Sequence, residues 1–397
     1  MHYSDLLELD DSLNPTDDLS EAIYSNTKLD FLLRGANIKE VAAPSNASTG
    51  NNESSADEGN LLEEETALIK TEDKEVQNRF KVPTNSLKKV LVGAHEGWVR
   101  SLTVDPVSNE WYVSGGGDSK IKIWDLASGS LKASLDGHIM AVRALTVSKR
   151  YPYLFSGAED KTVRCWDLER TNSPAGCQIR DYHGHVGGIY AIDLHPELDL
   201  LFTGGRDAVV RVWDIRSRTQ VMVLTGHRGD VSSIVSQVGD PQVCSSSMDG
   251  TVRLWDLRKQ KTHLTLTQHS KSVRSLVMHP HEMTMASCDS TGRIREWLLP
   301  GGELLSEFGK TGMDAMSPVI NTMAINPTSN ELFAGHADGK MAFYDYESGQ
   351  ELSTVLQNPV PGNDTCTIYT SAYDMSGLRL ITGSSDKSIK IWSTEDS

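Results

Sequence analysis

A segment of about 31 residues recurs along most of this chain and limits the folds that it can adopt. In the copy from residue 226 to 256, Gly226-His227 opens the segment and Trp255-Asp256 closes it. Three short runs lie between them, separated by Gly-Asp-Pro and Met-Asp-Gly, which are turn sequences that join antiparallel strands. Aligned on the closing aromatic residue, the chain holds seven copies, at Trp124, Trp166, Trp213, Trp255, Trp297, Tyr344 and Trp392.

These copies resemble WD repeats. Each step between closing aromatics is 42 to 48 residues, and Gly-His or its histidine opens the first five copies. A period of about 40 to 45 residues with Gly-His and Trp-Asp is typical of the WD repeat, which forms one four-stranded blade. The resemblance implies an all-β fold, a seven-bladed WD40 β-propeller over residues 86–397.

The ends of the repeat region predict how the ring closes. Each repeat supplies three strands, and the strand before the next repeat is the outer strand of the same blade. The last repeat ends at Trp392, with no outer strand after it, whereas residues 86–92 have the length and pattern of a strand and precede the first repeat. We expect residues 86–92 to complete the seventh blade, which would also hide an edge strand.

Residues 1–85 do not match the repeats and carry most of the charge. They hold 18 acidic and 7 basic residues, in a chain whose net charge is −16. We expect an acidic N-terminal extension with short helices and a disordered linker at residues 42–60. An apolar stripe follows at Leu62, Ile69, Val76 and Phe80. It fits either a helix that docks on a partner or a frayed segment that rests on the propeller.

Composition excludes several kinds of function. The longest basic run is Lys88-Lys89, which argues against sequence-independent nucleic-acid binding. The five cysteines show neither CxxC spacing nor nearby histidines, so we expect reduced thiols, no metal and no cofactor. No window of 18 apolar residues occurs, and the chain starts with acidic residues, so we expect neither membrane insertion nor secretion.

The recurring histidine, hydroxyl and aspartate could be interpreted as a nucleophile and its base. An active site occurs once, however, whereas this arrangement recurs, so we expect no catalytic residue and no small-molecule substrate. The family resemblance implies instead a hydrogen-bonded tetrad inside each of four blades: His95, Ser114, Asp118 and Trp124; His138, Ser156, Asp160 and Trp166; His185, Thr203, Asp207 and Trp213; His227, Ser245, Asp249 and Trp255.

The last three repeats depart from this pattern. In the fifth, Thr291 stands at the position of the turn aspartate, and in the sixth Ala334 replaces the hydroxyl. The sixth and seventh repeats also lack Gly-His. We therefore expect four complete tetrads and several partial ones.

Residues near the repeat starts that the fold does not require are candidates for binding partners. They are Trp98, Arg100, Met140, Arg143, Tyr190, Arg206 and Arg274. Trp and Arg are common interface anchors, and arginines at one repeat position would form a basic ring at the channel mouth, suited to an acidic peptide. The alternative is that these arginines pair with the turn aspartates and hold neighbouring blades together.

Several stretches resemble one family more closely than the general repeat requires. They include HEGWVRSLTVDPVSNEWYVSGGGD (residues 95–118), YPYLFSGAEDKTVRCWDLE (151–169) and LRLITGSSDKSIKIW (378–392). They are similar to WD-repeat splicing factors of the pleiotropic regulator 1 type, a family of subunits of the Prp19-associated (NineTeen) complex. Residues 1–85 match this family poorly.

This resemblance implies a non-enzymatic protein-interaction scaffold of the spliceosome that supports pre-mRNA splicing. Its partners would be protein subunits of the spliceosome and the Prp19-associated complex, with RNA contact only within the complex. It would act in the nucleus, and the cytoplasm stays open as a second location. The alternative function is that of a WD-repeat substrate receptor of a ubiquitin ligase.

Overall fold

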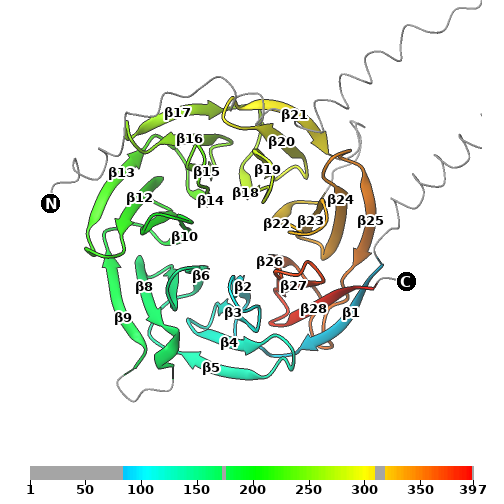
Figure 1. Ribbon diagram of the computed structural model, residues 1–397. Helices are drawn as coiled ribbons and strands as arrows, with labels where there is room; N and C mark the ends of the chain where they lie inside the picture. The colour runs from blue at the N-terminus through cyan, green and yellow to red at the C-terminus, as the bar shows by residue number, and fades with distance from the viewer. Residues whose placement is uncertain (1–83, 172–175, 309–317, 396–397) are drawn as a thin grey trace, which may run out of the picture. The chain divides into compact units, whose positions relative to one another are not determined.

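The structure is a computed structural model that describes residues 84–171, 176–308 and 318–395. Within these residues, seven four-stranded antiparallel sheets stand around a central channel (Figure 1). The prediction of an all-β, seven-bladed WD40 propeller is confirmed. The helices and linker predicted within residues 1–85 lie outside the described residues. Of this range, the structure describes only residues 84 and 85, which begin the first strand. The chain divides into a unit of residues 1–79 and a unit of residues 80–397.

The blades follow one another around the ring in sequence order, and each runs from an innermost strand to an outermost strand. Blades one to four are β2 (Val99–Val104), β3 (Trp111–Gly116), β4 (Ile121–Asp125) and β5 (Leu131–Leu135); β6 (Val142–Val147), β7 (Tyr153–Ala158), β8 (Thr162–Asp167) and β9 (Gln178–His183); β10 (Ile189–Leu194), β11 (Leu200–Gly205), β12 (Val209–Asp214) and β13 (Gln220–Thr225); β14 (Val231–Ser236), β15 (Val243–Ser247), β16 (Val252–Asp256) and β17 (Lys261–Leu266).

Blades five to seven continue the ring, and the seventh is completed from the other end of the domain. Their strands are β18 (Val273–Met278), β19 (Thr284–Asp289), β20 (Ile294–Leu298) and β21 (Glu303–Phe308); β22 (Ile320–Ile325), β23 (Glu331–His336), β24 (Lys340–Asp345) and β25 (Glu351–Leu356); β26 (Ile368–Tyr373), β27 (Arg379–Ser384), β28 (Ile389–Glu395) and β1 (Thr84–Leu91). A short 3-10 helix, Leu168–Arg170, follows β8.

The ring closes by pairing the first strand with the last. β1 lies antiparallel to β28, with Leu87 opposite Trp392 and Leu91 opposite Ile389. In Figure 1, β1 occupies the outer place of blade seven, which β5 and β9 occupy in blades one and two. The chain therefore enters and leaves the ring through one sheet, and the edge of β28 is covered.

The hydrophobic core lies between the blades. Val113 and Ile123 of blade one pack in one cluster with Val142, Leu154 and Trp166 of blade two. Blades seven and one join in the same way, through a further cluster of residues from both. Since each blade buries one face against the blade before it and the other against the blade after it, a blade cannot bury its apolar surface alone.

Removing β1 should open the ring. We expect a chain that begins at residue 92 to melt about 10 °C below a chain that begins at residue 84, because several kcal/mol of pairing and packing are lost. We also expect it to aggregate through the uncovered edge of β28. Differential scanning calorimetry and light scattering of the two chains measure both effects. Equal melting temperatures would contradict the role given to β1.

Candidate functional site

Five blades contain a hydrogen-bonded tetrad of histidine, hydroxyl, aspartate and tryptophan. In all five, the imidazole Nε2 lies 2.7–2.8 Å from the hydroxyl oxygen. The indole Nε1 donates to the same oxygen at 2.7–2.8 Å. The imidazole Nδ1 lies 2.8–3.3 Å from a carboxylate oxygen. The structure thus brings together each group of four residues that the sequence analysis named.

The tetrad has a direction, which assigns the proton of each ring. A hydroxyl has one hydrogen to donate, and in each tetrad it already accepts the indole N–H. The ionised aspartate can only accept, so Nδ1 carries the ring hydrogen and donates it to the carboxylate. Nε2 of the neutral ring then accepts the hydrogen of the hydroxyl. The aspartate also accepts a backbone N–H from the residue after the histidine, as in Glu96 to Asp118 at 3.1 Å. In blades one to four, these bonds tie the loop that begins the blade to the turn between its second and third strands.

The fifth tetrad corrects the sequence analysis. Thr291 stands at the turn position, but Asp289, two residues earlier, bonds to His269 at 3.2 Å and is fully buried. Its other oxygen accepts from the backbone N–H groups of Thr291 and Arg293. Blade five is therefore complete, and the expectation of four tetrads is wrong by one.

The spacing of the other blades explains this exchange. The position of Asp289, eight residues before the tryptophan, holds only small residues in blades one to four: Gly116, Ala158, Gly205 and Ser247. A side chain added at Gly116 would collide with Asp118 Oδ1 and His95 Nδ1. A carboxylate can therefore reach the histidine from either position, and the turn aspartate requires a small residue at the earlier one.

Blades six and seven are held differently. In blade six, His336 donates from Nδ1 to the carbonyl of Pro318 at 3.0 Å. In blade seven, the indole of Trp392 donates to Thr382 at 3.1 Å, but a buried lysine replaces the histidine. The ammonium of Lys390 lies 3.0 Å from Asp386. The sequence analysis missed this pair, because a basic residue also stands four residues after the turn aspartate in blades one to four, at Lys122, Arg164, Arg211 and Arg253.

The tetrads are not arranged for nucleophilic catalysis. The side chains of His138 and Asp160 are almost fully buried, and the hydroxyl of Ser156 is enclosed with its partners. All five cysteines are free and buried, and burial raises the pKa of Cys165 and Cys288 to about 12, so these thiols stay protonated. Among the described residues, no cluster of His, Cys, Asp or Glu could hold a metal ion. No helix in the described ranges is long and apolar enough to cross a membrane.

The side chains at the channel mouth are set by a repeated irregularity in the innermost strands. In every blade the pairing of the innermost strand shifts around its second residue, which is a β-bulge. Bulges redirect a side chain out of the normal alternation. The seven bulged residues are Arg100, Arg143, Tyr190, Ser232, Arg274, Asn321 and Tyr369.

Two of these seven residues hold the ring together. Ser232 donates to the carbonyl of Val273 at 2.6 Å, and Asn321 donates to that of Ile368 at 3.0 Å. Each bond joins a blade to the next one. The remaining five bulged residues are arginines and tyrosines, and none of them makes such a bond. We call the surface formed by Trp98, Arg100, Arg143, Tyr190 and Tyr369 the mouth cluster.

The mouth cluster crosses blades seven, one, two and three. The guanidinium carbon of Arg100 lies 4.6 Å from the ring centre of Trp98 and 4.4 Å from that of Tyr369. These two rings stack at 5.7 Å. Arg143 lies 4.9 Å from the ring centre of Tyr190. These contacts are of the cation–π kind. Tyr369 was not among the residues that the sequence analysis selected.

The arginines do not pair with the turn aspartates. Arg143 binds Glu159, with Nε at 2.6 Å and Nη2 at 2.5 Å from one carboxylate oxygen. Arg100 forms no ion pair with any described residue, and Asp207 is approached by Arg211, not by Arg206. The alternative stated that these arginines pair with the turn aspartates, and that pairing is absent for Arg100, Arg143 and Arg206 among the described residues. The other three candidates lie outside the mouth cluster. Met140, three residues before Arg143, and Arg206 are exposed, and Arg274 is partly buried.

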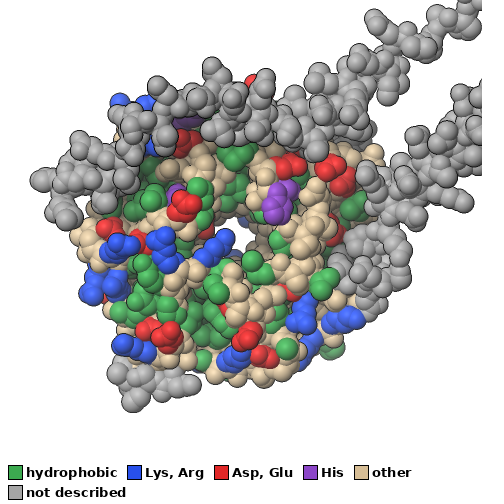
Figure 2. Space-filling view, viewed as in Figure 1, with side chains coloured by type: hydrophobic (Ala, Val, Ile, Leu, Met, Phe, Trp, Pro, Cys, Tyr) green, Lys and Arg blue, Asp and Glu red, His purple; other side chains and the backbone are tan. Residues whose placement is uncertain are grey.

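The opposite face of the propeller carries hollows between blades. An open pocket of about 700 Å³ lies between blades one and two, where Figure 2 shows hydrophobic side chains gathered. Its apolar lining includes Val107, Trp111, Val147, Tyr151, Pro152 and Leu168. Lys132, Lys149 and Arg150 also line it. Sequence reasoning missed this surface, because it is formed by two repeats together.

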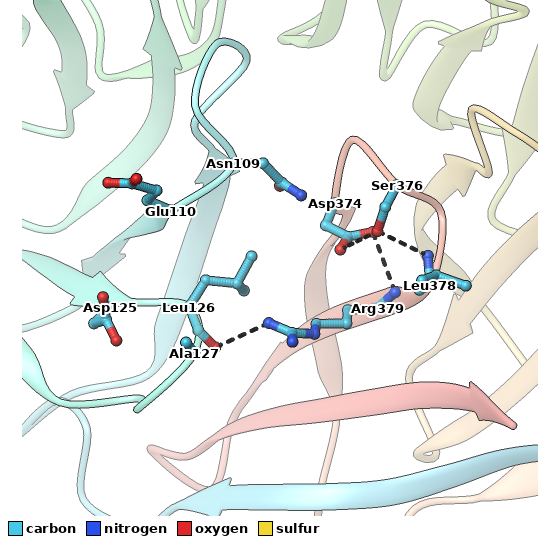
Figure 3. Close-up of a pocket in the computed structure, with 9 residues that line it drawn as sticks. All are labelled: Asn109, Glu110, Asp125, Leu126, Ala127, Asp374, Ser376, Leu378 and Arg379. Atoms are coloured by element: carbon cyan, nitrogen blue, oxygen red, sulfur yellow. Dashed lines mark hydrogen bonds between the residues drawn. The ribbon is translucent and has the colours of Figure 1, made fainter.

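A second pocket, of about 470 Å³, marks the seam where the ring closes (Figure 3). There Arg379 of blade seven donates to the carbonyl of Leu126 in blade one at 3.3 Å. The backbone N–H of Met375 donates to Asn109 at 3.2 Å. Both hydrogen bonds join blade seven to blade one, which favours a structural role for this pocket.

Comparison with known proteins places the chain in a family. The family model described as "WD domain, G-beta repeat" matches residues 85–125, 129–167, 176–214, 218–256, 260–297 and 354–393. The chain is 56% identical over 402 residues to pre-mRNA-splicing factor PRP46 of Debaryomyces hansenii, covering 99% of this chain and 94% of that one. The chain therefore belongs to the PRP46 family of WD-repeat proteins.

Two further relatives extend this result. The PRP46 factor of Candida albicans is 57% identical over 394 residues, covering 98% of this chain and 97% of its own. That of Saccharomyces cerevisiae is 49% identical over 310 residues, covering 77% and 66%. Since the first two alignments span nearly the whole chain, they extend over most of residues 1–85. The expectation that this extension matches the family less well than the repeats stays a prediction.

The shifted position of the tetrad aspartate in blade five, Asp289 in place of residue 291, generates a first prediction for the site. Asp289→Ala should lower the free energy of unfolding by about 3 kcal/mol, because it leaves a buried imidazole and two backbone N–H groups without their acceptor. Thr291→Ala, the control, should cost about 1 kcal/mol or less. Urea denaturation of both variants measures the difference. Equal losses would contradict the assignment of Asp289.

The tetrads also predict sensitivity to acid. Burial raises the pKa of Asp118, but the hydrogen bond and charge of His95 and two backbone N–H groups outweigh it, so the pKa falls from 3.8 to about 2. The pKa values of Asp249 and Asp289 also fall to about 2. A carboxylate whose pKa is lower in the folded state stabilises the fold above its unfolded pKa and loses this effect as the pH falls.

We therefore expect the free energy of unfolding to fall between about pH 4 and pH 2. Asp118→Asn should reduce that pH dependence, because one coupled carboxylate is removed. Urea titrations at a series of pH values measure it. A stability that stays constant between pH 4 and pH 2 would contradict the part given to these aspartates.

Proposed function

We propose that this protein is a non-enzymatic scaffold of the spliceosome that supports pre-mRNA splicing by binding other proteins. The observation that carries the proposal is the high identity, over nearly the whole chain, to factors named as pre-mRNA-splicing factors. A propeller whose recurring polar groups are enclosed supports a binding role. Its activity then depends on the surfaces that it presents.

The geometry supports binding at the mouth cluster. The tetrads fix the loops that begin each blade, so the side chains beside them are held in place before a partner arrives. Rigid placement lowers the ordering cost of association. Trp98 is 46% exposed although its ring is large, and it stacks on Tyr369. Exposed aromatic and arginine side chains on a rigid frame are typical of interface anchors.

We further propose that the partners are protein subunits of the Prp19-associated complex, and that the protein acts in the nucleus. The family resemblance and the names of the relatives support both points. RNA contact would occur only within the assembled complex. The alternative function, a substrate receptor of a ubiquitin ligase, is favoured neither by the names of these relatives nor by the described surfaces.

Affinity purification of the tagged protein from nuclear extract tests this function. We expect recovery of splicing proteins together with small nuclear RNAs. Trp98→Ala combined with Arg100→Ala and Arg143→Ala should reduce that recovery about tenfold, because the anchors of the interface are removed. The melting temperature should change by only about 2 °C or less, since these side chains are not in the core.

A matched control removes exposed apolar side chains elsewhere. Leu131, Val223 and Leu304 lie on the outer strands β5, β13 and β21 and are also exposed. Changing all three to alanine should leave the recovery of small nuclear RNAs unchanged. If the wild-type protein recovers no small nuclear RNA, the proposed function is wrong. If both triple variants lose it equally, the mouth cluster is not the binding surface.

A further inference from the structure

Arg100 is a cation with aromatic neighbours and with no ion pair to any residue that the structure describes. Its guanidinium lies over both Trp98 and Tyr369, which takes it partly out of water. Burial and the nearby Arg143 lower the pKa of Arg100, and the smaller effects of Tyr369 and Glu159 oppose this shift. No ion pair or hydrogen bond from this guanidinium reaches a described residue. Its N–H donors are therefore available. Hydrogen bonds from them to an acceptor would offset part of the free energy that the guanidinium loses when it leaves water.

Blade two shows what blade one lacks. Arg143 occupies the same bulged position as Arg100, and its carboxylate partner is Glu159. Glu159 stands seven residues before Trp166, and the residue seven before Trp124 in blade one is Gly117. Blade two thus holds Arg143 together with a carboxylate. Blade one holds Arg100 at the equivalent position, but has a glycine where that carboxylate would stand.

The surroundings of Arg100 favour an acidic partner that also carries apolar side chains. Ile139 and Met140, in the loop before β6, are exposed, and Met140 is 52% exposed. The loops between the second and third strands of blades two, three and seven carry the exposed residues Lys161, Arg206 and Lys387. These cations are exposed, whereas the turn aspartates beside them, Asp160, Asp207 and Asp386, are bonded to partners within their own blades. This asymmetry would steer an acidic segment towards the mouth.

We propose that the guanidinium of Arg100 receives an aspartate or glutamate side chain from a partner protein, which takes the place that Glu159 fills beside Arg143. An adjacent large apolar side chain of the partner packs on Trp98 and Met140. The proposal rests on the proposed function in that the ligand is a protein. It deepens that function by naming the chemistry that the mouth cluster recognises.

A protein ligand fits this site better than single-stranded RNA. A stacking platform for bases needs free aromatic faces, but Trp98 and Tyr369 already contact each other and Arg100. A carboxylate needs only the planar fork of one guanidinium, which binds it through two parallel hydrogen bonds.

The test is a selection of displayed random peptides of about twelve residues on the full-length protein. We expect enriched peptides to contain Asp or Glu next to Trp, Phe or Leu. The strongest peptide is then synthesised with a fluorescent label and titrated by fluorescence anisotropy. Replacing its acidic residue by the matching amide should weaken binding about tenfold.

Three variants of the protein sharpen this test. Arg100→Gln and Arg100→Lys should each weaken binding about tenfold, because glutamine lacks the charge and lysine lacks the planar fork. Gly117→Glu should also weaken it, because it supplies in blade one the carboxylate that blade two already has. Arg228→Gln, which removes an exposed charge from another loop on the same face, should leave the affinity within about twofold. Thermal melts check that each variant is folded.

Several outcomes would overturn the proposal. They are enrichment of peptides without acidic residues, equal losses in Arg100→Gln and Arg228→Gln, or unchanged binding in a folded Gly117→Glu variant. A labelled single-stranded oligouridine that binds the wild type and is lost in Arg100→Gln, without any acidic peptide being selected, would assign the mouth to RNA. The selection uses the purified chain alone, so its result is independent of whether small nuclear RNAs are recovered from extract.

Discussion

The structure depends on ring closure, because a blade buries its apolar faces only when it has a neighbour on each side. A linear array of seven blades would leave the first and last faces in water. The pairing of β1 with β28 closes the array with backbone hydrogen bonds, and the seam is reinforced where Arg379 meets the carbonyl of Leu126. The channel, the mouth cluster and the grooves between blades all follow from this closure.

Within the closed ring, buried polar groups set the position of the loops. A tetrad connects the loop that begins a blade to the turn between its second and third strands, and every donor within the tetrad finds an acceptor. Blade seven reaches the same end with Lys390 and Asp386. The mouth cluster therefore stands on a frame whose hydrogen bonds are satisfied without it, so its side chains are available for a partner.

Much of the fold could be predicted from the sequence, because the repeat fixes both strand count and strand spacing. The tetrads of blades one to four followed from the family resemblance, applied to the recurring histidine, hydroxyl, aspartate and tryptophan. Asp289 was missed because a carboxylate can reach His269 from two positions, and one-dimensional spacing shows only the usual one. Tyr369 was missed for a different reason. It belongs to the last blade, and only ring closure brings it beside Trp98 of the first.

The distinction between the two arginines of the mouth could not be predicted either. Arg100 and Arg143 occupy equivalent positions in the sequence, and both were selected as one basic ring. Their environments differ because Glu159 in blade two corresponds to Gly117 in blade one. Among the residues that the structure describes, Arg143 thus has an ion-pair partner and Arg100 has none. A repeated position identifies candidates, but the contacts of each copy decide their chemistry.

The central claim is that this protein binds its partners through the face that holds the mouth cluster. Hydroxyl-radical footprinting of the free protein and of the protein within its purified complex measures this directly. Met140 is 52% exposed near the mouth, and Met375 is 51% exposed in the loop between β26 and β27 on the opposite face. We predict that oxidation of Met140 and Trp98 falls in the complex while that of Met375 is unchanged. Protection of Met375 with full oxidation of Met140 and Trp98 would contradict the claim.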